Sequence, residues 1–205
     1  MKNRQIYFYV VAALATVVPV PGRFAFGFLM LLLFNVQIVT GVLTCHLVAL
    51  LKLDDLKNVI VSVELIAVTI LFKQIIILLC PVAALTLGFL LYLPALSSAL
   101  IEFSFKGTML SLAEDIKEKS IRNAIFSVVA LIIYLVRDIV GFGTITFPAW
   151  QKIAAAHVSV FAHTTYASSF LATVPGAFVL SALMLALYLF VTGQFDKIER
   201  AGGGK

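Results

Sequence analysis

Long apolar runs separated by short polar or proline-containing breaks dominate this sequence. A membrane-spanning helix needs about 20 predominantly apolar residues, because the hydrocarbon core is about 30 Å thick and a helix rises about 1.5 Å per residue. The pattern predicts six segments, at about residues 6–18, 24–51, 59–79, 81–102, 124–140 and 170–193. We therefore expect an all-α integral membrane protein with a single transmembrane domain over residues 1–205.

Two of the six segments are interrupted by proline. The first is short and stops at Pro19 and Pro21, and the fourth contains Pro94. Three spans in each half give the two halves opposite topology, and broken helices at corresponding positions are typical of inverted-repeat transport proteins. The sequence thus favours two inverted repeats, at about residues 1–80 and 81–205. The broken first and fourth helices should meet towards the membrane interior.

Composition agrees with the membrane assignment and excludes other classes. Apolar residues make up 62% of the 205 residues and charged residues 12%, whereas a soluble domain carries about a quarter charged residues. A soluble enzyme and a disordered chain are both excluded on this basis. The net charge of +5 is not concentrated in a basic run interleaved with aromatic residues, so nucleic acid is not an expected partner.

The distribution of Lys and Arg predicts the orientation. The N-terminus, the loop between the second and third segments, the loop at 106–122 and the C-terminal tail together hold 11 of these residues, against 4 on the other side. By the positive-inside rule, both termini and the 106–122 loop face the cytoplasm. We expect the chain to lie in the cell (inner) membrane.

Three stretches resemble a known family. They are LVRDIVGFGT at 135–144, VPGAFVLSALMLAL from Val174, and LGFLLYLPALSSALIE at 87–102. In order and spacing they are similar to the small six-helix membrane subunits of Rnf-type ferredoxin:NAD oxidoreductases and sodium-translocating NADH:quinone reductases. The resemblance implies that paired subunits share a [2Fe–2S] cluster, held by cysteines on the two half-helices near the membrane midplane.

The cysteines of this chain do not follow that pattern. The corresponding stretches, 14–19 and 96–100, contain no cysteine, while Cys45 and Cys80 lie in the second segment and at the end of the third. Iron–sulfur clusters need thiolate ligands, with His a minority substitute. We therefore expect a diverged member with no cofactor and no metal of its own.

Four ionisable residues within or beside the apolar segments are the candidate sites of an ion path or of structural polar contacts: Glu64, Glu102, Arg137 and Asp138. Ionisable groups at membrane depth pair with one another or line an ion path. Glu64 could instead pair with Lys57 or reach the headgroups. Arg137 and Asp138 are adjacent and cannot face each other on a helix, so each is expected to bind another element, as a structural end-cap rather than as an ion gate. Glu102 has the same two interpretations.

Other polar positions are interpreted structurally. Lys73 is expected to extend towards the headgroups, and Gln37, Thr40, Gly41 and Thr44 form one small, polar helix face suited to helix packing. Residues 148–169 are expected to form a surface helix or a short re-entrant segment, with Trp150 at headgroup level. No catalytic motif is present.

The sequence favours a membrane subunit of a hetero-oligomeric ion-translocating or electron-transport complex. Its expected partners are other membrane subunits, including a second six-helix relative, and the lipid bilayer. It is not expected to be catalytic alone, although it could belong to a membrane oxidoreductase complex. A stand-alone secondary transporter and a structural membrane partner are the alternatives.

Overall fold

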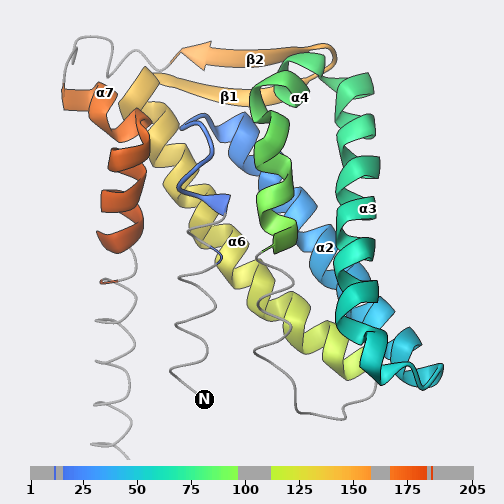
Figure 1. Cartoon of the computed structure of the whole chain (residues 1–205). Coiled ribbons are helices and arrows are strands. Elements are labelled where there is room, and N and C mark those ends of the chain that lie inside the picture. Colours follow the sequence, from blue (N-terminus) through green and yellow to red (C-terminus); the bar gives the residue numbers. More distant parts are fainter. Residues whose placement is uncertain (1–11, 13–15, 97–111, 158–166, 184–185, 187–205) are drawn as a thin grey trace, which may run out of the picture.

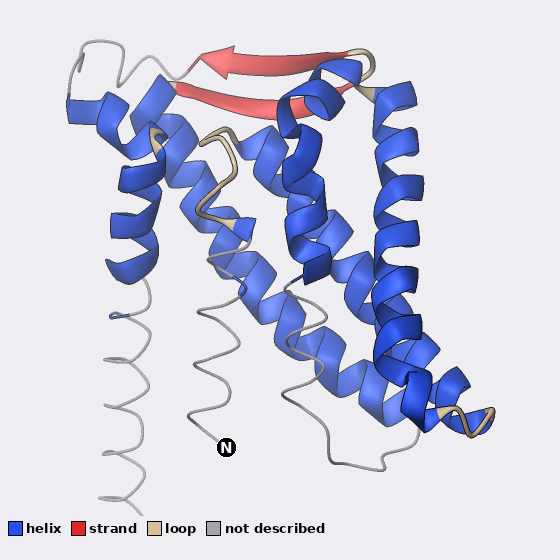
Figure 2. Ribbon diagram, viewed as in Figure 1, coloured by secondary structure: helices blue, strands red, loops and turns tan. Residues whose placement is uncertain are grey.

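The structure is a computed structural model that describes residues 12, 16–96, 112–157, 167–183 and 186. It is a helical bundle with a two-stranded hairpin across one end (Figure 1; Figure 2). The elements are α2 (Phe24–Leu50), η1 (Asp54–Leu56), α3 (Lys57–Leu79), α4 (Pro81–Leu87), η2 (Gly88–Tyr92), α6 (Leu112–Phe142), β1 (Thr144–Ala149), β2 (Lys152–His157) and α7 (Ala167–Ala172). A further apolar helix, Val174–Leu183, follows α7.

Three of the described helices are long and apolar enough to cross a membrane: Phe24–Leu50, Lys57–Leu79 and the Lys119–Phe142 part of α6. At about 1.5 Å per residue each exceeds the thickness of a hydrocarbon core. Their outward faces carry large exposed apolar side chains, such as Ile70 and Leu71 on α3 and Ile132 on α6. This surface is stable in lipid and not in water, so the chain is a membrane protein.

The centre of the bundle is the crossing of α2 and α6 (Figure 1). Gly27 makes the close approach possible, because a Cβ atom there would overlap the ring of Tyr134. Further along the crossing, the rings of Phe34 and Phe126 pack edge to face at 5.8 Å. A small residue opposite a large aromatic one is a common way to bring membrane helices together.

Helix α3 packs against the other side of α2. Gln37, which is fully buried, donates a 2.8 Å hydrogen bond from Nε2 to Oγ1 of Thr69 on α3. Gly41, on the same face of α2, is also buried. The small, polar face of the second segment is thus a helix-packing surface between α2 and α3.

The first segment ends inside the bundle. The helix stops at Thr16, and residues 17–23 run in an irregular path to the hairpin end, where α2 begins (Figure 1). The expected position of the break, near Pro19, lies within this irregular stretch. Its backbone groups need partners from elsewhere in the protein, because lipid offers none.

The fourth segment is irregular at Gly88 rather than at Pro94. Gly88 has φ +44°, and a Cβ atom at this position would meet no other atom within 4 Å, so its backbone conformation and not crowding favours glycine. It begins a 3-10 turn, η2, and helical structure resumes at residues 93–96, which include Pro94. Proline is tolerated in the first turn of a helix because its missing N–H would have no intrahelical partner there. The expectation of a break at Pro94 is therefore wrong in position.

Two other expectations are corrected. The stretch expected as a surface helix or re-entrant segment begins instead as a hairpin, in which β1 and β2 pair antiparallel from Thr144↔His157 to Ala149↔Lys152.

Helix α6 begins at Leu112 and not near residue 124, so the second half of the expected 106–122 loop is helical. Polar residues with good helix propensity, Lys and Glu, extend the helix beyond its apolar part.

The contact between Gly27 and Tyr134 gives a direct test of the α2–α6 crossing. Gly27→Ala should lower the free energy of unfolding by about 1–3 kcal/mol, because the added methyl group forces the two helices apart. Thermal unfolding in lipid nanodiscs measures the loss. Ala67→Val, which adds volume at an exposed position of α3, is the control and should have little effect. Equal midpoints for both variants would contradict the close approach.

Candidate functional site

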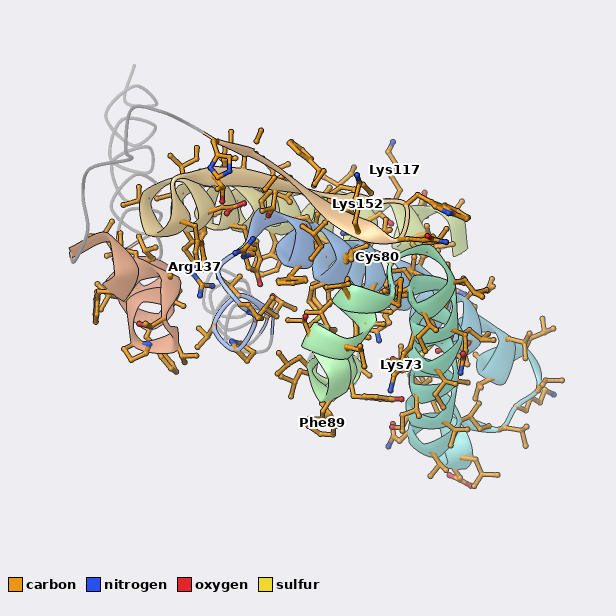
Figure 3. The ribbon with its side chains drawn as sticks, turned by 90° about the horizontal axis from the view of Figure 1, so that it is seen from above. Lys73, Cys80, Phe89, Lys117, Arg137 and Lys152 are labelled. Atoms are coloured by element: carbon orange, nitrogen blue, oxygen red, sulfur yellow. The ribbon has the colours of Figure 1, made fainter. Side chains whose placement is uncertain are left out.

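Arg137 and Asp138 lie near the end of α6, next to the hairpin, and both are fully buried. Because they are adjacent on the helix, their side chains diverge and contact different elements. The arginine bonds backbone carbonyl groups, and the aspartate bonds backbone amides and hydroxyl groups. The two residues and their contacts form the candidate site, which Figure 3 locates by the labelled Arg137.

The guanidinium of Arg137 donates to four carbonyl oxygens of two segments. Nη1 bonds the carbonyls of Val17 at 2.9 Å and Val20 at 3.2 Å. Nε bonds the carbonyl of Leu171 at 3.2 Å, and Nη2 bonds that of Ala172 at 3.3 Å. Leu171 and Ala172 end α7, where carbonyls lack intrahelical partners and the helix dipole favours a cation. The arginine therefore joins the irregular end of the first segment to the end of α7.

The carboxylate of Asp138 caps the amino end of α2. Oδ2 accepts from the backbone N–H of Phe24 at 3.1 Å and from the N–H and hydroxyl of Thr146, both at 2.7 Å. Oδ1 accepts from the hydroxyl of Thr144 at 2.9 Å. Thr146 in turn accepts the N–H of Ala25 at 3.1 Å. The residue at the N-cap position, Arg23, makes no side-chain cap, so α2 is capped by residues far along the chain.

The site is close-packed around these two side chains. A Cβ atom at Gly22 would lie 3.2 Å from Nε of Arg137 and from the carbonyl oxygen of Ala172. One at Gly141 would lie 2.9 Å from Cβ of Ala172. Tyr134, one turn before Arg137, donates its hydroxyl to the carbonyl of Thr16. Glycine at 22 and 141 thus allows three backbone segments to meet at the arginine.

The arrangement is one of structural support. Arg137 and Asp138 carry opposite charges, and each is bonded to several hydrogen-bonding groups of other segments. Burying a charged group is tolerable when hydrogen bonds replace those it made to water. Each of the two residues thus binds other elements, as their adjacency on the helix predicts.

The other two candidate residues lie apart from this pair or outside the described residues. Glu64 is half-buried on α3, in the half of that helix that begins at Lys57, whereas Arg137 and Asp138 lie at the hairpin end (Figure 1). Glu102 lies outside the described residues. Of the three candidate residues that the structure describes, Arg137 and Asp138 thus lie together and Glu64 lies apart from them.

Sequence reasoning missed a second polar cluster, between α2 and α6. Asn35 donates from Nδ2 to the hydroxyl of Ser127 and accepts from Nδ2 of Asn123, both at 2.8 Å. Asn123 is 1% exposed, and its Oδ1 atom has no hydrogen-bond partner among the described residues. The signal available in the sequence was Asn35 itself, an amide within an otherwise apolar run.

Lys73 contacts an aromatic ring. Its Nζ atom lies 5.7 Å from the centre of the Tyr92 ring, and Phe89 packs beside that ring at 6.0 Å. Figure 3 shows Lys73 and Phe89 on the neighbouring α3 and α4–η2 segments. A cation over an aromatic face gains about 0.5–2 kcal/mol. The side chain of Lys73 was expected to extend towards the headgroups, and the structure places its Nζ atom over the Tyr92 ring instead.

The two cysteines lie at different ends of the bundle. Cys45 is buried in the second half of α2, while Cys80 is buried at the junction of α3 and α4, where its Sγ lies 3.6 Å from the carbonyl oxygen of Lys152. Within the described ranges, no group of three or more His, Cys, Asp or Glu side chains could hold a metal ion.

Comparison with known proteins gives no match: no family model, no curated protein and no solved structure is similar enough to this chain to assign a family.

The four carbonyl contacts of Arg137 predict a large effect of a conservative change. Arg137→Lys should lower the free energy of unfolding by about 2 kcal/mol or more, because one ammonium group cannot reach carbonyls of both segments. Arg23→Lys is the matched control, since Arg23 is only half-buried and stacks on Phe142 at 4.8 Å. Thermal unfolding of both variants is the measurement. A loss at Arg23 as large as that at Arg137 would contradict the proposed role.

Proposed function

We propose that this chain is a membrane subunit of a hetero-oligomeric ion-translocating or electron-transport complex. It is related to the small subunits of the Rnf and sodium-translocating NADH:quinone reductase complexes and holds no iron–sulfur cluster of its own. The observation that carries the proposal is the broken first segment, which ends inside the bundle and is held there by Tyr134 and Arg137 of α6. Irregular backbone at membrane depth is typical of transport proteins.

The order of the elements supports two inverted repeats. In the first half, a segment broken after Thr16 leads into the long α2, which begins at the hairpin end, and α3 packs on α2 (Figure 1). In the second half, the fourth segment changes from α4 to the 3-10 turn η2 at Gly88, and the long α6 ends at the hairpin end and contacts α7. The central helices α2 and α6 thus run in opposite directions, as two inverted copies would.

The positions of the thiols support a subunit without a cluster. The described parts of the two half-helix stretches, residues 16–19 and residue 96, carry Thr, Val, Pro and Leu. Cys45 and Cys80 lie at opposite ends of the bundle and would have to leave their own helices to meet. A hydroxyl group is a poor substitute for a soft thiolate.

Purification from native membranes tests this proposal. We expect companion membrane subunits to copurify, including one with a similar helix pattern and cysteines on both half-helices. We also expect the chain isolated from them to lack iron and acid-labile sulfide. A chain that purifies as a solitary homodimer would favour a secondary transporter that uses Glu64.

A cysteine-free variant separates the cluster question from the partner question. Cys45→Ser combined with Cys80→Ser should assemble with the companions in normal amount, because neither thiol is placed to ligate metal with the other. Iron analysis and subunit quantification are the measurements. Stoichiometric iron that disappears in the double variant would restore a cluster to this chain.

Accessibility to an impermeant thiol reagent tests the orientation. Lys52 lies in the loop between α2 and α3, and Lys57 is the first residue of α3. The excess of basic residues on that side favours a cytoplasmic location in the inner membrane. In the cysteine-free background, Gln151→Cys at the hairpin turn should react in intact cells. Asp55→Cys should react only after the membrane is permeabilised. The reverse pattern would invert the proposed topology, including that of both termini.

A further inference from the structure

In the hairpin, β1 packs against α2 and α6, and β2 lies further out. β2 contacts the bundle at its start, where the Lys152 carbonyl oxygen accepts from Cys80 Sγ and Ile153 packs against the core. Figure 1 and Figure 2 show β1 between β2 and the helix ends. Thr144 and Thr146 of β1 are buried and bonded to Asp138. In β2 every side chain is exposed except that of Ile153, which is half-buried. β2 is therefore the outermost element of the described structure at this end.

The register shows which backbone groups of β2 face outward. In an antiparallel pair, opposed residues alternate between positions that bond each other and positions that do not. The N–H of Thr146 donates to Asp138, and Pro148 has no N–H group. These two residues therefore occupy the positions of β1 that are not hydrogen-bonded to β2. Their partners in the register are Ala155 and Ile153. Those two residues, and His157 opposite Thr144, direct their N–H and C=O groups away from β1.

Beyond Lys152, this outer edge lacks the proline, charged residues and bulges that usually protect an exposed strand. Native proteins place proline, charged residues or bulges along such edges, because unpaired N–H and C=O groups bind other strands. Between Lys152 and His157, β2 carries only Ile153 and three alanines. In the part of the chain that the structure describes, the backbone of Ile153, Ala155 and His157 makes no bond beyond the hairpin.

The direction of the edge limits what can bind it. It faces away from the helix ends (Figure 1), so a second copy in the same membrane, with its hairpin at the same level, cannot pair with it edge to edge. Lys152 at one end of β2 is exposed. The only described carboxylate at the hairpin end, that of Asp138, is buried. A binding segment with an acidic side chain near Lys152 would meet complementary charge.

We propose that the outer edge of β2 binds an extended, acidic segment of a companion protein on the hairpin side of the membrane. The segment adds a third strand to the sheet. Backbone groups of Ile153, Ala155 and His157 supply the hydrogen bonds, and the alanine side chains leave room on both faces of the strand. This mode of recognition is β-strand addition. The inference rests on the proposed function, which supplies the companion.

Hydrogen–deuterium exchange resolved to single residues tests the edge directly. The complex from native membranes is compared with the chain purified alone in nanodiscs. The amide protons of Ile153, Ala155 and His157 should exchange at least about tenfold more slowly in the complex. The amides of Ala154 and Ala156 face β1 and should be protected in both samples, which makes them an internal control.

Two substitutions at one position test the role of the outward N–H. Ala155→Pro removes that N–H while leaving the bonds to β1, as Pro148 already does on the opposite strand. It should therefore reduce retention of the companion that contacts the hairpin. Ala155→Ser keeps the N–H and should retain the companion. Protection of the Ala154 and Ala156 amides shows whether the hairpin of each variant is intact.

The charge of the segment has its own test. Lys152→Glu should also reduce retention of the companion, while Lys152→Arg should not. Unchanged retention in Lys152→Glu would overturn the acidic assignment.

The outcomes distinguish this inference from the proposed function. Companions that copurify while the three outward amides exchange as fast as in the solitary chain would overturn the inference and leave the proposed function standing. A chain that has no companion in native membranes would overturn both. Slow exchange in the complex, lost together with the companion in Ala155→Pro, is the result that supports β-strand addition.

Discussion

Backbone hydrogen bonding at the hairpin end is the constraint on which the rest of this structure depends. Several segments begin or end there, and each leaves N–H or C=O groups that neither a helix nor lipid can satisfy. Arg137 supplies donors to the carbonyls and Asp138 supplies acceptors to the amides. Because the two residues are consecutive, a single turn of α6 provides both kinds of partner.

Helix α6 is consequently the organising element of the bundle. The same end of it carries Tyr134, which contacts Gly27 of α2 and the last turn of the first segment. Gly141 lies in the following turn and allows α7 to approach closely. The polar contacts at this end and the apolar contacts along the α2–α6 crossing act on the same helix. Their positions fix the direction in which α2, α7 and the hairpin leave it.

Much of the helical framework could be predicted from the sequence, because unbroken apolar runs long enough to cross a membrane have few alternatives. Helices α2 and α3 lie close to the expected 24–51 and 59–79. Arg137 and Asp138 were identifiable as ionisable residues in an apolar segment. Their hydrogen-bond partners were not identifiable, since Val17 lies 120 residues from Arg137 in the sequence.

The hairpin could not be predicted from the sequence. Alanine, which is abundant in β2, favours helices, and β1 is fixed by its tertiary contacts with Asp138. Asn123 gave no signal because its burial depends on the α2–α6 crossing.

The cap on α2 has a consequence for biosynthesis. Phe24 and the carboxylate that caps its N–H are 114 residues apart. The ribosome therefore completes α2, α3 and α4 well before the residue that satisfies the start of α2 has been made. During that interval water or the insertion machinery must solvate the open end of α2, and the early helices cannot reach their final arrangement. The start of α2 can therefore be capped only after α6 has been made, so the last step in the folding of the first half waits for the second half.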